Sequence, residues 1–240
     1  MSSAWPLDQV IATIGAIGGA ALAATGALAW GAFERNSQLF GPVQRRLTTD
    51  DPVVALTFDD GPNELATPAI LDALGSAGVR ATFFVLGRHA ERWPELVERM
   101  KVEGHVVANH GYHHRKLTFR GPRYVRDDIA LGSRWIERAG GGRPSLFRAP
   151  HGYRNPWVTP IAHRAGQRTV GWTLGVWDTA RPGSMVIADR VIRRAGPGGI
   201  ILLHDGDGYD ARGDRMQTAA AVPVVIRGLR ERGFSFATLP

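Results

Sequence analysis

The chain has 240 residues, 44% of them hydrophobic, which is enough for one domain of moderate size with an appendage. It contains no cysteine, so disulfides and thiolate metal ligands are excluded, and histidine and carboxylate side chains remain as metal ligands. The net charge is +7, but the arginines are scattered over predicted helix faces without interleaved aromatic residues, and we expect no nucleic-acid partner.

The first predicted element is an apolar span. Residues 10–33 carry no charge, and as a helix they would extend about 36 Å, more than the roughly 30 Å of a hydrocarbon core. Trp5 and Trp30 stand near its ends, where interfacial aromatic residues belong. We therefore expect residues 1–33 to form a membrane anchor. A cleaved signal peptide and a buried helix rich in alanine stay open as alternatives.

The orientation of this anchor is poorly determined by the sequence. Arg35, Arg45 and Arg46 follow the span and no Lys or Arg precedes it, so the positive-inside rule places the rest of the chain in the cytoplasm. Three residues are a weak signal, and the conflict with the envelope substrate considered below is left open. Residues 34–50 are expected to be a linker.

From residue 51 onward, strand-like and helix-like segments alternate. Strands are predicted at 53–58, 81–86, 105–109, 145–148, 168–174, 199–204 and 234–238. Helices are predicted near 66–77, 89–103, 122–139, 156–166, 184–195 and 217–232. Seven strands alternating with six helices indicate an α/β fold with a parallel sheet, either a barrel or a doubly wound sheet.

Polar side chains that can do chemistry gather at the ends of these strands. Asp59 and Asp60 follow the first strand, His110 and His114 the third and Asp178 the fifth, while Arg148 ends the fourth and His204 the sixth. Ligands of α/β barrels and of open sheets bind at the carboxyl ends of the strands. We therefore expect all of these side chains to share one cleft.

A metal site is the first chemistry that this set suggests. The i, i+4 spacing of His110 and His114 can put both rings on one face of a helical turn. Together with one aspartate they form a His, His, Asp set with an open position. Such a set suits Zn(II), which acidifies water, and it also suits non-haem Fe(II).

Hydrolysis is the second chemistry that these side chains suggest. Arg148 can fork onto a carboxylate and keep it ionised, and a backbone amide near Tyr153 could donate to an oxyanion. His204 can act as a general acid, with Asp178 orienting it and raising its pKa. A metal, a carboxylate base, an oxyanion donor and a protonated histidine are the parts needed to hydrolyse an amide or an ester.

Five motifs occur in the order found in a known family. They are Thr-Phe-Asp-Asp-Gly-Pro at 57–62, His-x-x-x-His at 110–114, Arg-x-Pro-x-Gly-Tyr at 148–153, the segment from Trp172 to Asp178, and Leu-Leu-His at 202–204. Over residues 50–240 the chain resembles the polysaccharide deacetylases of the chitooligosaccharide deacetylase type. The resemblance implies a distorted (β/α)7 barrel, here preceded by a transmembrane helix, and removal of N- or O-acetyl groups with a divalent metal, most often Zn²⁺, with Co²⁺ or Ni²⁺ as further possibilities.

The resemblance also assigns roles to single residues. Asp60, His110 and His114 would bind the metal. Asp59 would be the general base and His204 the general acid. Arg148 would position Asp59, Asp178 would pair with His204, and the backbone N–H of Tyr153 would stabilise the oxyanion.

Two of the motifs depart from the family pattern. The position after the first histidine of the second motif is usually Ser or Thr and is Gly111 here. The fourth motif usually reads Asp-x-x-Asp-Trp, but Gly175 and Thr179 replace its first and last residues, although Trp177 could fill part of the same space.

We therefore expect a deacetylase domain at residues 51–240, held by its anchor on the outer face of the plasma membrane and acting on an N-acetylated polysaccharide or oligosaccharide of the cell envelope. The loop 205–214 would help to choose the substrate. An amidase acting on a small molecule or a lipid-linked sugar, and a non-catalytic sugar-binding protein, are the alternatives.

Overall fold

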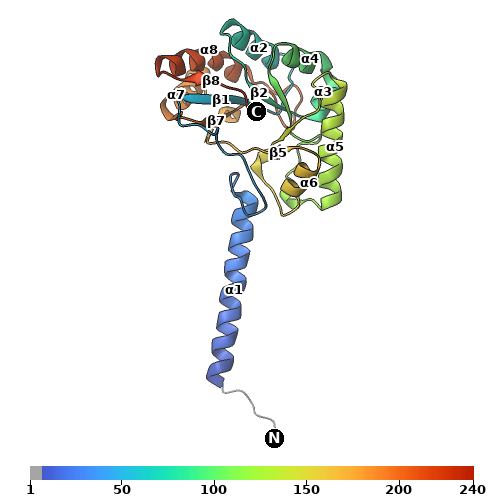
Figure 1. Ribbon diagram of the computed structural model, residues 1–240, viewed down its shortest axis with the longest axis vertical. Helices are drawn as coiled ribbons and strands as arrows, with labels where there is room; N and C mark the ends of the chain where they lie inside the picture. The colour runs from blue at the N-terminus through green and yellow to red at the C-terminus, as the bar shows by residue number, and fades with distance from the viewer. Residues whose placement is uncertain (1–6) are drawn as a thin grey trace.

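A long helix projects from an α/β domain (Figure 1). The structure is a computed structural model that describes residues 7–240. Helix α1 (Leu7–Phe33) leaves the domain on one side, whereas α2 (Ala66–Ser76), α4 (Pro94–Val102) and α8 (Met216–Glu231) lie on the far side. The anchor predicted at residues 1–33 begins before the described part of the chain, and from residue 7 onward it is helical.

The domain is built on one curled parallel sheet. Its strand order is β5-β4-β3-β2-β1-β7-β6, with β8 also paired to β1. The strands are β1 (Val53–Asp59), β2 (Thr82–Val85), β3 (Val106–Asn109), β4 (Leu146–Phe147), β5 (Arg168–Thr169), β6 (Leu174–Gly175), β7 (Gly199–His204) and β8 (Ser235–Phe236). With the helices around it, this sheet matches the predicted distorted (β/α)7 barrel.

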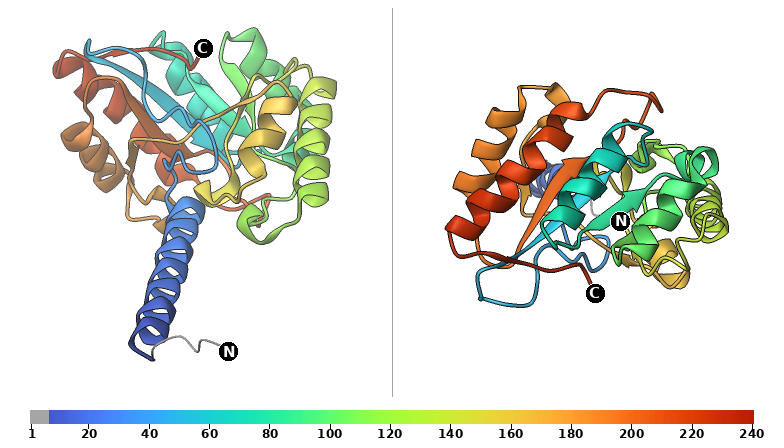
Figure 2. Two further views of the ribbon diagram at one scale, coloured as in Figure 1. Left: turned by 60° about the horizontal axis from the view of Figure 1, so that its bottom comes forward. Right: turned by 90° about the horizontal axis from the view of Figure 1, so that it is seen from above.

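The helices surround the sheet, as the right-hand view of Figure 2 shows. The remaining ones are α3 (Gly87–Arg92), α5 (Pro122–Arg138), α6 (Val158–Arg164) and α7 (Ser184–Arg194). The helix predicted at 89–103 is two helices, because Pro94 starts α4 and holds Trp93 out of the helical region, at φ −132° and ψ 63°.

Alternation along β1 decides which side chains enter the barrel. Val54, Leu56 and Phe58 pack outward among the residues of the surrounding helices. Ala55 packs with the interior cluster, and Thr57 and Asp59 follow it on the same face at a period of two. The strand therefore carries its apolar side chains to the helix layer and delivers a carboxylate to the inside of the barrel.

The barrel is open between β5 and β6. The strand predicted at 168–174 is interrupted at Gly171, so that β5 pairs with β4 and β6 pairs with β7. Gln44 pairs with the free edge of β5: its N–H donates to Thr169 O and its carbonyl accepts from the Gly171 N–H, both at 2.9 Å. A glycine in a strand-like run is a usual place for such a break.

Residues 34–50 are part of the fold. We expected a linker here, yet Phe40, Val43 and Leu47 are buried, and the Leu47 N–H donates to Gly198 O at 2.8 Å. This segment runs from the end of α1 along the open edge of the barrel, so the helix is joined to the domain by packed chain.

Candidate active site

The two adjacent aspartates reach one cavity because the chain turns sharply between them. Asp59 is the last residue of β1 and points inward, whereas Asp60 has a left-handed backbone with φ 73°. Nδ1 of the buried His89 ring lies 2.7 Å from the backbone carbonyl oxygen of Asp60, and this hydrogen bond supports the conformation. A non-glycine residue at positive φ costs free energy, and it persists where its surroundings hold it, commonly at functional sites.

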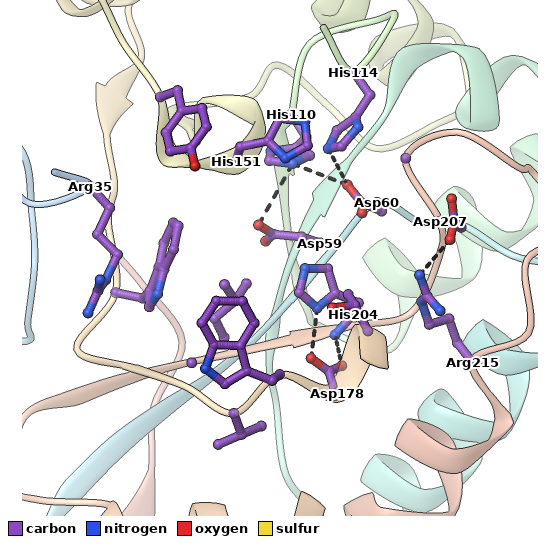
Figure 3. A pocket seen from close by; sticks show the side chains of 18 of the residues that line it. Arg35, Asp59, Asp60, His110, His114, His151, Asp178, His204, Asp207 and Arg215 are labelled. Carbon is purple, nitrogen blue, oxygen red and sulfur yellow. Dashed lines mark hydrogen bonds and ion pairs between the residues drawn. The ribbon is translucent and has the colours of Figure 1, made fainter. Parts of the chain in front are cut away.

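Asp60, His110 and His114 form a compact ligand set. One ligand atom from each lies within 4.8 Å of the others, and all three residues are buried. Asp60 Oδ1 is 3.1 Å from His114 Nε2 and 3.3 Å from His110 Nε2 (Figure 3). Burial opposes ionisation of Asp60, but His114 and His110 outweigh it and lower the pKa of the carboxyl well below its ordinary value.

The surroundings of the set fit a metal ion. His110 Nδ1 lies 2.8 Å from Arg148 O, so with a metal bound this nitrogen would carry the proton and Nε2 would present its lone pair to the ion. One carboxylate and two imidazoles on buried, converging side chains are a donor set for Zn²⁺, and the same set also accommodates Fe²⁺.

Asp59 is held by a buried arginine. Arg148 Nη1 donates to Asp59 Oδ1 at 2.6 Å and to Thr57 Oγ1 at 2.8 Å, while Nη2 donates to Gly171 O at 2.9 Å. The guanidinium also stacks on Phe84, 4.0 Å from the ring centroid. Burial lowers the pKa of Arg148, yet an arginine stays charged at any working pH, so a positive charge lies against the Asp59 carboxyl group and fixes its position.

His204 and Asp178 form the second charged pair. Asp178 accepts from the His204 ring Nδ1 at 2.9 Å and from its backbone N–H at 2.8 Å, and Thr218 Oγ1 donates to it at 3.0 Å. Burial favours the neutral imidazole, but the Asp178 carboxylate outweighs it and raises the pKa of His204 to about 9. The ring is therefore protonated at neutral pH, which suits a general acid.

The predicted oxyanion donor already has an acceptor. The Tyr153 N–H donates to Pro150 O at 3.2 Å in a 3₁₀ turn at Pro150–Gly152. The side chain of Tyr153 lines the cavity. An oxyanion would have to share this N–H with the carbonyl, and the role stays a prediction.

Asp128 supports the loop in which Gly111 replaces the usual Ser or Thr. Gly111 has φ +78°, and a Cβ there would lie 2.5 Å from Asp128 Oδ2. The same carboxylate accepts from the N–H groups of Tyr112 and His113, each at 3.1 Å. Asp128 therefore stands where a side chain would project, and it supplies hydrogen bonds to the loop.

The altered fourth motif places an aromatic side chain at the cavity rim. Trp177 has φ 58° and is 75% exposed, so it does not fill the interior. Trp172 lines the inner wall between Arg148 and Arg35, whose guanidinium carbons lie 5.6 and 5.4 Å from its ring centroid.

Sequence reasoning missed Asp205 and His151. Asp205 is buried beside Gly61, its Oδ2 accepts from Thr67 at 2.6 Å, and burial raises its pKa to about 7. The His151 ring lies 4.6 Å from that of His114, and its Nε2 is 3.0 Å from the Tyr209 hydroxyl. His151 lies within the motif at 148–153 and Asp205 directly follows the motif at 202–204, and this position in the sequence could have indicated both residues.

The loop 205–214 closes one side of the cavity. Arg215 Nη2 pairs with Asp207 Oδ2 at 2.6 Å, and Arg88 donates to Gly208 O at 2.6 Å. A Cβ at Gly208 would overlap the His114 ring, so only glycine lets the loop approach this closely. The cavity has a volume of about 680 Å³. Six of the seven polar residues predicted to share it line its wall, and the seventh, Arg148, is buried behind Asp59.

Comparison with known proteins agrees with this geometry. The polysaccharide deacetylase family profile matches residues 46–170. A chitooligosaccharide deacetylase of Sinorhizobium fredii is 40% identical over 81% of this chain and 94% of its own length. A peptidoglycan-N-acetylglucosamine deacetylase of Bacillus cereus is 36% identical over 83% and 92%, respectively.

Solved structures show the same fold. The family 4 carbohydrate esterase from Streptomyces lividans, solved with acetate, superposes with a TM-score of 0.72 at 33% identity, covering 80% of this chain and 95% of the esterase. The range matched by the family profile includes Asp59, Asp60, His110, His114 and Arg148. The chain belongs to the polysaccharide deacetylase family.

Proposed function

We propose that the protein is a metal-dependent deacetylase that hydrolyses the N-acetyl group of an amino sugar. The observation that carries this proposal is the pair of charged couples beside the ligand set. Asp59, which Arg148 holds from behind, and the pair of His204 and Asp178 line the same cavity as Asp60, His110 and His114 (Figure 3). A protein that only binds sugar has no need of a held base and a protonated acid in one cavity.

The metal would be held by Asp60, His110 and His114. When bound, it would polarise the acetyl carbonyl and lower the pKa of water. Zn²⁺ suits the donor set best, with Co²⁺ or Ni²⁺ as substitutes.

The remaining steps belong to the side chains. Asp59, positioned by Arg148, takes a proton from the attacking water, whose oxygen bonds to the acetyl carbon. His204 donates its proton to the sugar nitrogen as the C–N bond breaks. Acetate and a free amine result, and Asp178 holds the imidazolium in place throughout. The Tyr153 N–H is a further candidate donor to the oxyanion.

The test is acetate release from N-acetylglucosamine oligomers. Asp59→Asn keeps the shape of the site and removes the base, so we expect a loss of about 10²- to 10⁴-fold with metal content unchanged. His110→Ala should lose metal and activity together. Asp127→Asn, an exposed aspartate on α5, is the matched control and should be unaffected. Wild-type activity in Asp59→Asn would contradict the proposal.

We also propose that the domain lies on the outer face of the plasma membrane. Two relatives are named for chitooligosaccharide and peptidoglycan, and the latter is a polymer of the cell envelope. Alkaline phosphatase fused after Pro240 should be active, because that enzyme requires an oxidising compartment. An inactive fusion with full-length expression would place the domain inside instead.

A further inference from the structure

The end of the apolar helix forms part of the active-site cavity. Phe33, the last residue of α1, and Arg35 both line the cavity together with Asp59, Asp60 and His204. Figure 3 shows Arg35 on one side of this cavity and Asp207 and Arg215 on the other. The membrane-spanning candidate and the catalytic residues therefore meet at one place.

This junction is fixed by packed contacts. The buried Arg154 guanidinium donates to the carbonyls of Glu34, Arg35 and Ser37 at 3.2, 3.3 and 2.8 Å, and its backbone N–H donates to Ala32 O at 3.0 Å. The Phe33 ring meets Tyr153 edge to face, 5.2 Å between centroids. The direction of α1 is therefore set relative to the catalytic face, with no flexible tether between them.

Beyond its last turn, helix α1 is exposed along the described part of the chain. Every residue from 15 to 30 is exposed, and the helix is long and apolar enough to cross a bilayer. If it spans the membrane, Phe33 lies where the hydrocarbon ends, and Arg35, two residues on, lies within about 7 Å of that level. The mouth of the cavity then opens at the depth of the lipid headgroups.

The surface around the mouth suits that position. Five aromatic residues, each between 39% and 75% exposed, lie here. Phe33, Trp177 and Tyr209 line the cavity. The Phe119 ring centroid lies 6.3 Å from that of Phe33, and Trp157 donates to the carbonyl of Arg120, next to Phe119. Exposed Arg115, Lys116 and Arg120 flank Phe119. Exposed aromatic residues and cations next to an apolar helix are typical of a membrane interface.

Arg35 offers a positive charge at this boundary. Its guanidinium lies over Trp172, and its buried Nε has no hydrogen-bond partner among the described residues. A phosphate group is a natural partner for an arginine held in this way. It would lie between the sugar in the cavity and a lipid tail in the bilayer.

We propose that the substrate is an N-acetylated amino sugar joined through phosphate to a membrane lipid, bound with its sugar in the cavity and its phosphate on Arg35. The proposal rests on the deacetylase function above and specifies its substrate. The same hydrolysis releases acetate into water, and the lipid-bound sugar with its new amine stays in the membrane. The cavity volume of about 680 Å³ is in the range of small-ligand sites, and Phe33 at the end of α1 forms part of its wall.

The first experiment measures acetate release by the full chain in phosphatidylcholine vesicles. The probes are N-acetylglucosamine on a long-chain lipid phosphate, the same sugar on an uncharged lipid, and the water-soluble N-acetylglucosamine trimer. We expect the lipid phosphate to be hydrolysed fastest, about tenfold faster than the uncharged lipid. Arg35→Gln should abolish the preference between the two lipids, and Arg126→Gln, on α5 and away from the cavity, should keep it.

Comparing the two lipids within one variant cancels any loss of folded protein. Faster hydrolysis of the trimer, or a preference that survives in Arg35→Gln, would overturn the lipid-phosphate substrate and leave the deacetylase proposal standing. No acetate from any probe would overturn both.

The second experiment tests the orientation without activity. Because the chain has no cysteine, Trp177→Cys or Val102→Cys can carry a single nitroxide label. Val102 is 79% exposed on α4, on the side away from α1 (Figure 1). In vesicles the label at 177 should be shielded from a water-soluble relaxation agent, and the label at 102 should be accessible. Equal accessibility at both sites would overturn the proposed membrane-facing cavity.

Discussion

At the scale of single residues, the charge on His204 depends on Asp178. The pair stabilises the imidazolium, so its contribution to stability is complete below the ordinary histidine pKa and is lost as pH rises through about 9. The general acid that we propose His204 to be must be protonated to act, so we expect the wild-type rate to fall only above about pH 9.

Asp178→Asn should move this alkaline limb to lower pH. Without the carboxylate, burial, the largest single effect on His204, is opposed only by Asp60 and Asp59, so the His204 pKa should fall below about 9, and the protonated fraction at pH 8, and with it kcat, should fall severalfold. The measurement is the pH profile of acetate release. Asp189→Asn, on the exposed face of α7, should retain the wild-type limb. An unchanged limb in Asp178→Asn would mean that another group sets it.

From the sequence, the side chains that face the cavity could be predicted, whereas the residues that hold the surrounding backbone in place could not. That these side chains share one cavity follows from residue type and from position at strand ends, because parallel strands bring their carboxyl ends together, whereas the family resemblance distinguished Asp60 from Asp59. His89 and Asp128 could not be assigned in this way. Each acts on a backbone conformation, at Asp60 and Gly111, that the sequence does not display.

At the scale of elements, the strand predicted at 168–174 shows where local pattern is insufficient. A β-branched and aromatic run predicts one strand. In the structure its first half, β5, pairs with β4 and its second half, β6, pairs with β7, and this choice depends on segments remote in sequence. Here Gln44 pairs with Val170 beside β5, and it comes from a segment that we predicted to be a linker. Non-local pairing of this kind is not encoded in the period of either segment.

The segment before β1 should therefore contribute to stability. Leu47 packs inside the barrel with Leu146, Val170 and Leu239. Leu47→Ala should lower the free energy of unfolding by about 2–4 kcal/mol, measured by urea denaturation. Leu39→Ala, a matched change at a site 49% exposed, should cost less than about 1 kcal/mol. Equal effects would show that the segment is only loosely attached.

At the scale of the whole molecule, the relation between anchor and active site could not be read from the sequence. Phe33 and Arg35 are remote in sequence from every catalytic motif, and only the fold brings them to the cavity. The sequence predicted the anchor and the barrel separately. Their junction depends on Arg154, a buried residue that no motif marks.

The ligand set also links the metal to global stability. Asp60 follows β1, whereas His110 and His114 follow β3, so the three ligands come together only in the folded chain. A metal that binds the folded state alone stabilises it by about 2.7 kcal/mol at a free concentration 100 times its dissociation constant. After chelation, added Zn²⁺ should therefore raise the urea midpoint of the full chain.

His114→Ala removes one ligand and should lose most of this increase, while His163→Ala, on the exposed side of α6, should retain it. The comparison reads the metal through folding, so it is independent of any substrate. Equal shifts in His114→Ala and the full chain would place the metal elsewhere, because stabilisation that survives the loss of a ligand cannot come from that ligand set.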